Sequence, residues 1–115
     1  MSRTLYKIKQ GEPLTLNLPL KVGGVATAVA GWTPYLTVKA DAGQPDSDAL
    51  ATLTLGSGIV VYDAYTWTAT LPSSATKTAL PSAYLIEIEA EDPAGDPHPL
   101  EECDLIIEPE LHRAA

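Results

Sequence analysis

The sequence predicts an all-β protein folded as an antiparallel β-sandwich, and two observations carry this prediction. Apolar and polar residues alternate with a period of two along most of the chain, as in strands with one buried and one exposed face. Turns rich in glycine and proline separate these segments, and no segment has the apolar spacing of an amphipathic helix. About seven to nine short strands fit one sandwich domain, which we expect to span residues 1–115.

Four segments of the N-terminal half alternate in this way. Residues 6–9, 14–20, 35–40 and 52–55 each send their apolar side chains to one face. Residues 41–48 lie between the last two segments and predict a loop, because they contain glycine, proline and three acids. The residues that we expect to face inward are Tyr6, Ile8, Leu14, Leu16, Leu18, Leu20, Leu36, Val38 and Ala40.

The C-terminal half contains three further alternating segments. Residues 65–71 alternate aromatic or aliphatic residues with threonines, residues 84–90 follow, and the last strand is expected near residues 100–108. Residues 72–78 predict either a loop or a single helical turn, and residues 92–97 predict a turn. The residues that we expect to face inward are Tyr65, Trp67, Ala69, Leu71, Tyr84, Ile86, Ile88, Ala90, Cys103, Leu105 and Ile107.

Composition and charge narrow the class of protein. Seven basic and fifteen acidic residues give a formal net charge of −8, which repels nucleic-acid phosphates and anionic membranes. We therefore expect neither nucleic acid nor a membrane as a partner. The charge is also uneven, because residues 87–110 hold ten acids and no lysine or arginine, whereas five of the seven basic residues precede Asp41.

The residues that commonly carry catalytic or metal chemistry form no motif in this sequence. Cys103 is the single cysteine, and its place in a strand favours a small buried side chain over a reactive or metal-binding thiol. His98 and His112 lack metal-ligand spacing, and no serine lies in a nucleophile elbow. We therefore expect no enzyme activity, no cofactor and no metal site.

A row of glutamates leaves two interpretations open. Glu87, Glu89 and Glu91 fall on one face of a strand, with Glu101 and Glu102 on its hairpin partner. Such a row is typical of a solvent-facing strand that resists aggregation, but paired carboxylates also suit acid–base hydrolysis or Ca²⁺ binding. We take the three glutamates of the first strand as candidate interface residues.

Two aromatic residues are further interface candidates. Trp32 follows Gly31 and precedes a Thr-Pro step at the mouth of a strand. It is either a plug of the core or an exposed anchor of an interface, where tryptophan is enriched. Tyr35 lies at the start of the same strand and is the second candidate.

Short motifs along the chain give it a family resemblance. Lys9-Gln10-Gly11-Glu12 leads into an alternating strand, and Pro81-Ser82-Ala83-Tyr84 precedes the penultimate strand. An Asp/Gly turn follows, from Asp92 to Gly95, and Ile106-Ile107-Glu108-Pro109 closes the chain's last strand. This order resembles the immunoglobulin-like domain at the N-terminus of phage baseplate upper proteins and related small virion proteins.

The resemblance implies a fold and a role. The fold is an immunoglobulin-like antiparallel sandwich, in which Tyr84 either forms a tyrosine corner, with its hydroxyl turned back onto upstream backbone, or serves as a core aromatic. The role is that of a non-enzymatic structural subunit in a phage tail, baseplate or capsid. Its partners are then other virion subunits, with a homo-oligomer as a further expectation, and its location is the virion after synthesis in the bacterial cytoplasm.

One other function stays open. Sandwich domains display binding sites in their loops, which here are residues 41–48 and 92–99. The alternative to a structural subunit is therefore a module that binds a carbohydrate or a host surface, with Ca²⁺ as an optional ligand. No row of exposed aromatic residues that would stack on a sugar is evident in the sequence.

Overall fold

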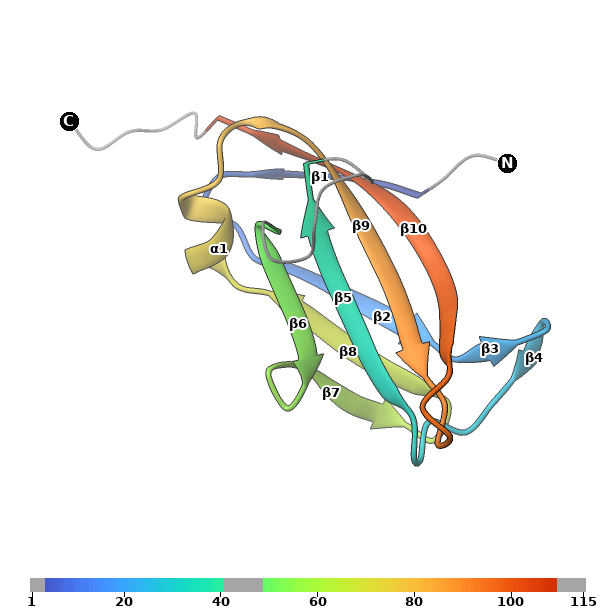
Figure 1. Ribbon diagram of the computed structural model, residues 1–115. Helices are drawn as coiled ribbons and strands as arrows, with labels where there is room; N and C mark the ends of the chain where they lie inside the picture. The colour runs from blue at the N-terminus through green and yellow to red at the C-terminus, as the bar shows by residue number, and fades with distance from the viewer. Residues whose placement is uncertain (1–3, 41–48, 110–115) are drawn as a thin grey trace.

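The computed structural model describes residues 4–40 and 49–109, and β-strands dominate this part of the chain (Figure 1). The all-β prediction is confirmed. The strand count exceeds seven to nine, because a short hairpin and one further strand join the predicted set. The elements are β1 (Thr4–Lys9), β2 (Leu14–Pro19), β3 (Lys21–Val22), β4 (Val25–Ala26), β5 (Thr33–Lys39), β6 (Ala51–Leu55), β7 (Gly58–Asp63), β8 (Thr66–Leu71), α1 (Ser73–Lys77), β9 (Ser82–Glu91) and β10 (Pro97–Glu108).

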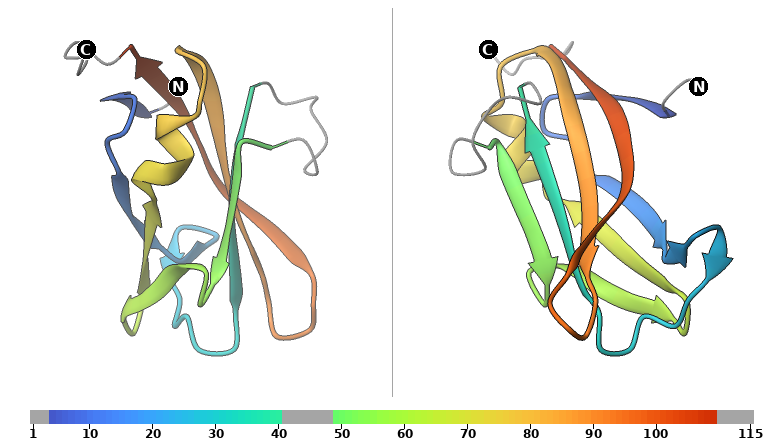
Figure 2. Two further views of the ribbon diagram at one scale, coloured as in Figure 1. Left: turned by 90° about the vertical axis from the view of Figure 1, so that its left-hand side faces the viewer. Right: turned by 45° about the vertical axis from the view of Figure 1, so that its right-hand side comes forward.

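The strands form the two layers of a sandwich. One layer has the order β1-β10-β9-β5-β6 and the other the order β7-β8-β2. Within residues 4–40 and 49–109, strand pairing connects the two layers only where β6 meets β7. Figure 2 shows the layers facing each other, with α1 near one end between them. Neighbouring strands are antiparallel, apart from the parallel pairs β1–β10 and β6–β7.

The strand order is that of an immunoglobulin-like sandwich. In such domains one sheet contains strands B, E and D side by side, and the other contains C, F and G. Taken along the chain, β2, β8 and β7 occupy the first set of places, and β5, β9 and β10 occupy the second. The parallel pairing of β1 with β10 adds the N-terminal strand to the second sheet.

A single apolar cluster fills the space between the layers. Trp67 on β8 has no exposed surface, and Leu36 on β5 and Ile86 on β9 are 1% exposed. Alternation predicted most of this cluster correctly, because one face of each strand is buried. Besides these three, the cluster includes Ile8, Leu16, Leu18, Leu20, Val38, Leu53, Ile59, Ala69, Leu71, Ile88, Ala90, Cys103, Leu105 and Ile107.

Two expected core residues are exposed instead. Tyr65 is 52% exposed, because β8 begins at Thr66 and Tyr65 lies in the turn before it. Ala40 is also exposed, since β5 ends at Lys39. Alternation within a strand predicts which face a residue takes, but it does not predict where the strand ends.

Strand β7 was not predicted from the sequence. Its residues do not alternate, because Val60, Val61 and Tyr62 follow Ile59 without a polar residue between them. Only Ile59 among the six residues of β7 is buried. The run of apolar side chains therefore lies mostly at the surface.

Helix α1 is the helical turn that the sequence offered as one of two choices for residues 72–78. The buried hydroxyl of Thr76 donates to the carbonyl oxygen of Glu12 at 2.8 Å. The side-chain amide of Gln10 donates to the carbonyl oxygen of Ala79 at 2.7 Å. These bonds tie α1 to the connection by which the chain passes from β1 in one layer to β2 in the other.

Tyr84 has the hydrogen bond of a tyrosine corner. Its hydroxyl donates to the carbonyl oxygen of Leu80, four residues upstream, at 2.7 Å. In antibody domains the residue two places after this tyrosine is a cysteine of the disulfide that joins the sheets. Here that place belongs to Ile86, which is buried. Burial, without a covalent bond, therefore joins the layers at this point.

We expect Tyr84→Phe to lower the free energy of unfolding by about 1 kcal/mol, because it removes one hydrogen bond and leaves the ring in place. Urea unfolding followed by tryptophan fluorescence measures this difference. Tyr65→Phe is the matched control, since Tyr65 is exposed in a turn and should change stability little. Equal effects of the two substitutions would contradict a stabilising role of the Tyr84 hydroxyl.

The crossing from β6 to β7 depends on two glycines with positive φ. Gly56 has φ of 84° and open space where a Cβ would lie, whereas Gly58 has φ of 98° and lies against Leu53. A Cβ at Gly58 would lie 2.6 Å from Cδ2 of Leu53, a core residue. Glycine is therefore favoured at position 58 for two reasons, the positive φ and the lack of space for a Cβ beside Leu53.

We expect Gly56→Ala to cost about 1–2 kcal/mol through its backbone conformation alone. Gly58→Ala should cost about 2–5 kcal/mol, because the displacement of Leu53 adds to the same backbone cost. Thermal unfolding of the two variants beside the natural chain measures both values. If the variants were equally stable, the contact with Leu53 would have no energetic weight.

Candidate functional site

A β-bulge in β10 lies beside a groove on the described surface. In the β9–β10 hairpin, Pro99 pairs with Glu89 and Glu101 pairs with Ile88, so Leu100 is an extra residue. A bulge of this kind changes which residues face each side of the strand. It places Glu101 on the same face as the core residues Cys103 and Leu105, and Glu102 on the outer face opposite Glu87.

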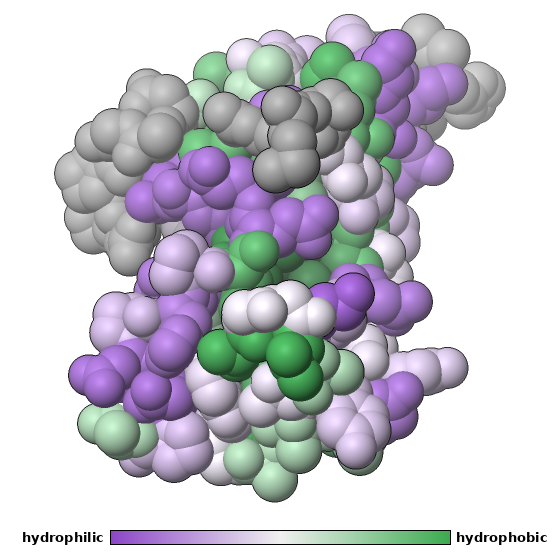
Figure 3. Space-filling view, turned by 90° about the vertical axis from the view of Figure 1, so that its right-hand side faces the viewer, coloured by the Kyte–Doolittle hydropathy of each residue, from purple (hydrophilic) through white to green (hydrophobic). Residues whose placement is uncertain are grey.

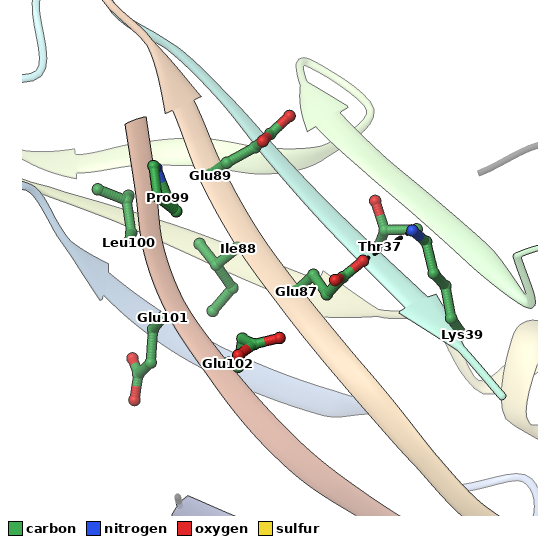
Figure 4. A pocket seen from close by; sticks show the side chains of 9 residues that line it. All are labelled: Thr37, Lys39, Glu87, Ile88, Glu89, Pro99, Leu100, Glu101 and Glu102. Atoms are coloured by element: carbon green, nitrogen blue, oxygen red, sulfur yellow. Dashed lines mark ion pairs between the residues drawn. The ribbon is translucent and has the colours of Figure 1, made fainter. Parts of the chain in front are cut away.

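The groove has a volume of about 420 Å³ and lies over β5, β9 and β10 (Figure 4). A smaller hollow of about 230 Å³ shares Ile88, Leu100 and Glu101 with it and extends toward the end of β2. Figure 3 shows hydrophobic and hydrophilic areas side by side on the flank of the molecule that carries β10. The groove is lined by Thr37, Lys39, Glu87, Ile88, Glu89, Pro99, Leu100, Glu101 and Glu102.

An ion pair between buried Lys39 and half-buried Glu87 lies at one end of the groove. The Nζ atom of Lys39 lies 2.7 Å from Oε1 of Glu87, and the lysine side chain is 8% exposed. Glu87 in turn lies opposite Glu102 across the strand pair, an arrangement of like charges that is unfavourable by itself. Lys39 balances one of the two carboxylates, so the lining keeps an excess of negative charge from Glu89, Glu101 and Glu102.

Of the five interface candidates, the structure brings Glu87 and Glu89 into the groove. Glu91 lies farther along the same face, where β9 ends, and is paired with Thr33. Tyr35 lies on β5 opposite Glu89, and the hydrogen bond of its hydroxyl with Glu91 raises the pKa of Tyr35. Glu91 and Tyr35 thus interact with each other next to the groove, and neither lines it.

Trp32 lies in a separate cluster at the turn of the β9–β10 hairpin. It is half-buried against the core, and its ring centroid is 5.0 Å from that of His98, with the planes tilted by 56°. The Nε2 atom of His98 is 3.0 Å from Oδ2 of Asp92. Oδ1 of Asp92 accepts hydrogen bonds from the backbone N–H groups of Ala94 and Asp96 at 2.9 and 3.0 Å.

The hydrogen bond from His98 is the largest cause of a lowered pKa at Asp92, and the two backbone donors add to it. A carboxyl whose pKa falls on folding stabilises the protein above its unfolded pKa, and this contribution is lost as the pH falls through the folded value. We therefore expect Asp92→Ala to reduce stability at pH 7 and to matter progressively less as the pH is lowered below about 4.

Thermal unfolding between pH 7 and pH 2 tests this expectation. Asp96→Ala is the control, because Asp96 is exposed in the same turn and its bonds with Asp92 come from its backbone, which the substitution keeps. A loss of stability on Asp92→Ala that is the same at every pH would contradict the role of the charged carboxylate.

His98 and Cys103 belong to residue types that often serve in catalysis. His98 contacts Asp92 and Trp32, neither of which is a nucleophile of acyl transfer. Burial raises the pKa of the Cys103 thiol to about 12, so it stays protonated and unreactive near neutral pH. Residues 4–40 and 49–109 contain no group of three or more histidine, cysteine or acidic side chains suited to a metal ion.

Two further features bear on partners. In the loop of residues 92–99, the Asp92 carboxylate already forms hydrogen bonds with Ala94, Asp96 and His98. The other loop considered as a binding site, residues 41–48, lies outside the described residues, as does His112. Nowhere in the described chain is there a helix with the length and apolar character needed to span a membrane.

Sequence reasoning missed Lys39 and Leu100 as parts of the site. Lys39 continues the outward-facing set of β5, but its ion pair depends on the register between β5 and β9. The bulge at Leu100 has a weaker signal in the sequence, namely two prolines just before it, which are tolerated at bulges and sheet edges.

Comparison with known proteins adds no named family. No protein family model matches the sequence, and no match was found among curated proteins. One similar solved structure is the ZIG-8–RIG-5 IG1–IG1 heterodimer in its monoclinic form, with 16% identity and a TM-score of 0.48 over 92% of this chain and 82% of that one. A likeness of this level supports no functional argument and contains nothing specific to phages. The strand order alone makes this chain an immunoglobulin-like β-sandwich.

Proposed function

We propose that this chain is a non-enzymatic structural subunit that binds a partner protein through the groove over β5, β9 and β10. The observation that carries the proposal is the groove itself, where an apolar floor at Ile88 and Leu100 is bordered by exposed glutamates. Apolar contacts bordered by polar groups are the usual composition of a protein interface.

The charge of the groove favours a basic partner segment. Glu89, Glu101 and Glu102 are exposed and have no lysine or arginine partner among the described ion pairs. Opposite charges at the rim of an interface raise the association rate and select the partner. A lysine- or arginine-rich strand or loop of a neighbouring subunit is therefore the kind of segment that fits.

The motif resemblance suggests where this contact is made. A subunit of a phage tail, baseplate or capsid acts through contacts with other subunits, and a rigid sandwich with an acidic groove suits that role. Antibodies against the purified chain should then label phage particles from a lysate of the source bacterium in electron micrographs. Detection of the chain only in fractions free of particles would contradict the virion role but leave the groove proposal intact.

We expect Glu89→Gln combined with Glu102→Gln to weaken binding of a lysine-rich octapeptide by about 2- to 30-fold, from about 0.2–1 kcal/mol for each exposed charge pair. Both glutamines keep the size of the side chain, and the pair avoids Glu87, whose loss would remove a carboxylate 2.7 Å from Nζ of buried Lys39. Fluorescence anisotropy with a labelled peptide at low and high salt measures the effect, which salt should reduce.

The matched control is the double variant Asp96→Asn with Glu108→Gln, which removes two charges from exposed residues outside the groove. It should change peptide affinity much less than the groove variant does. Peptide binding that responds equally to both variants would mean that overall charge, rather than the groove, attracts the peptide.

A further inference from the structure

Strand β7 presents an edge that its own domain leaves unpaired over most of its length. It pairs with β8 from Ile59 to Asp63, with a shift of register between Val61 and Asp63, but it meets β6 only at Gly58 and Ile59. From Val60 onward no other strand of the described chain lies along its second edge. An unpaired edge is a template for the addition of another strand.

The backbone N–H and C=O groups of Val61 point toward this open edge. The carbonyl oxygen of Ile59 accepts a hydrogen bond from the N–H of Gly56 at 2.8 Å, so the polar groups of Ile59 face away from β8. Backbone groups of residues two apart in a strand point the same way. The N–H and C=O of Val61 therefore lie at the open edge, whereas those of Val60 face β8.

The side chains around Val61 are apolar and exposed. Val60, Val61 and Tyr62 are 58%, 57% and 69% exposed, and no charged residue occurs in β7 before Asp63. Two other edges of the sandwich differ, since Lys7 and Lys9 lie on β1 and Pro19 lies at the end of β2. Charged residues and prolines are the common means of blocking edge pairing.

We propose that β7 pairs antiparallel with β7 of a second copy of this chain, with the two-fold axis at Val61. In that register Val61 of each copy donates its N–H to the Val61 carbonyl oxygen of the other, and Val60 of each faces Tyr62 of the other. The same surface serves both copies, so the contact closes as a dimer. It joins the two β2-β8-β7 layers into one sheet.

Charge favours a second copy at this edge over other faces of the molecule. Each chain has a net charge of −8, so its acidic faces repel one another. Residues 58–62 are uncharged, and antiparallel pairing places the two Asp63 side chains at opposite ends of the contact. A contact of a few residues is smaller than a standard stable interface, so the dimer should form reversibly with concentration.

Exchange of charge at the axis tests the proposal. Val61→Lys and Val61→Glu each place two like charges opposite each other across the axis, which should weaken dimerisation about tenfold or more. An equimolar mixture of the two variants places lysine opposite glutamate and should dimerise at least several-fold more strongly than either variant alone. Sedimentation equilibrium over a wide concentration range measures all four samples, including the natural chain.

Val61 is exposed, so both variants should keep the circular dichroism spectrum of the natural chain. A natural chain that stays monomeric at the highest concentration would overturn the proposal, as would variants that dimerise like the natural chain. Failure of the mixture to recover dimers would also count against pairing at Val61. The groove variant Glu89→Gln with Glu102→Gln should dimerise normally, which keeps this test separate from that of partner binding.

Discussion

The two layers of this sandwich depend on the burial of apolar side chains between them, because a chain with one cysteine has no disulfide to join the sheets. Trp67 is the largest fully buried side chain and comes from the layer with only three strands. Loss of a buried tryptophan or phenylalanine side chain costs about 3–5 kcal/mol, a large part of the stability of a small domain. Two hydrogen bonds add to this burial, one from the Tyr84 hydroxyl to Leu80 and one from Thr76 of α1 to Glu12.

The groove is a consequence of how one strand meets that core. From Cys103 onward β10 alternates regularly and buries one face, but before it Leu100 adds a residue to the strand. Without the bulge, Glu102 would not lie opposite Glu87, and the charges that border the groove would be divided differently between the two faces. The site and the core therefore share one strand, whose two halves have different functions.

Alternation in the sequence was sufficient to predict the strands that bury one face, as residues 14–20 and 84–90 show. It failed where that condition is not met: β7 buries only Ile59, and Tyr65 lies in a turn. The candidate site was predicted only in part. The glutamates of β9 follow from alternation, whereas the Lys39–Glu87 pair and the bulge depend on pairing between strands distant in the chain, which periodicity does not contain.

The groove and the open edge of β7 belong to different layers, so neither surface blocks the other. The groove lies on the layer of β5, β9 and β10, and β7 is the edge of the opposite layer. The two surfaces also differ in chemistry, because one is acidic and suits a basic segment, whereas the other is uncharged and suits its own copy. A dimer through β7 would present two grooves at once, and two linked sites bind a repetitive partner far more tightly than one when its spacing matches.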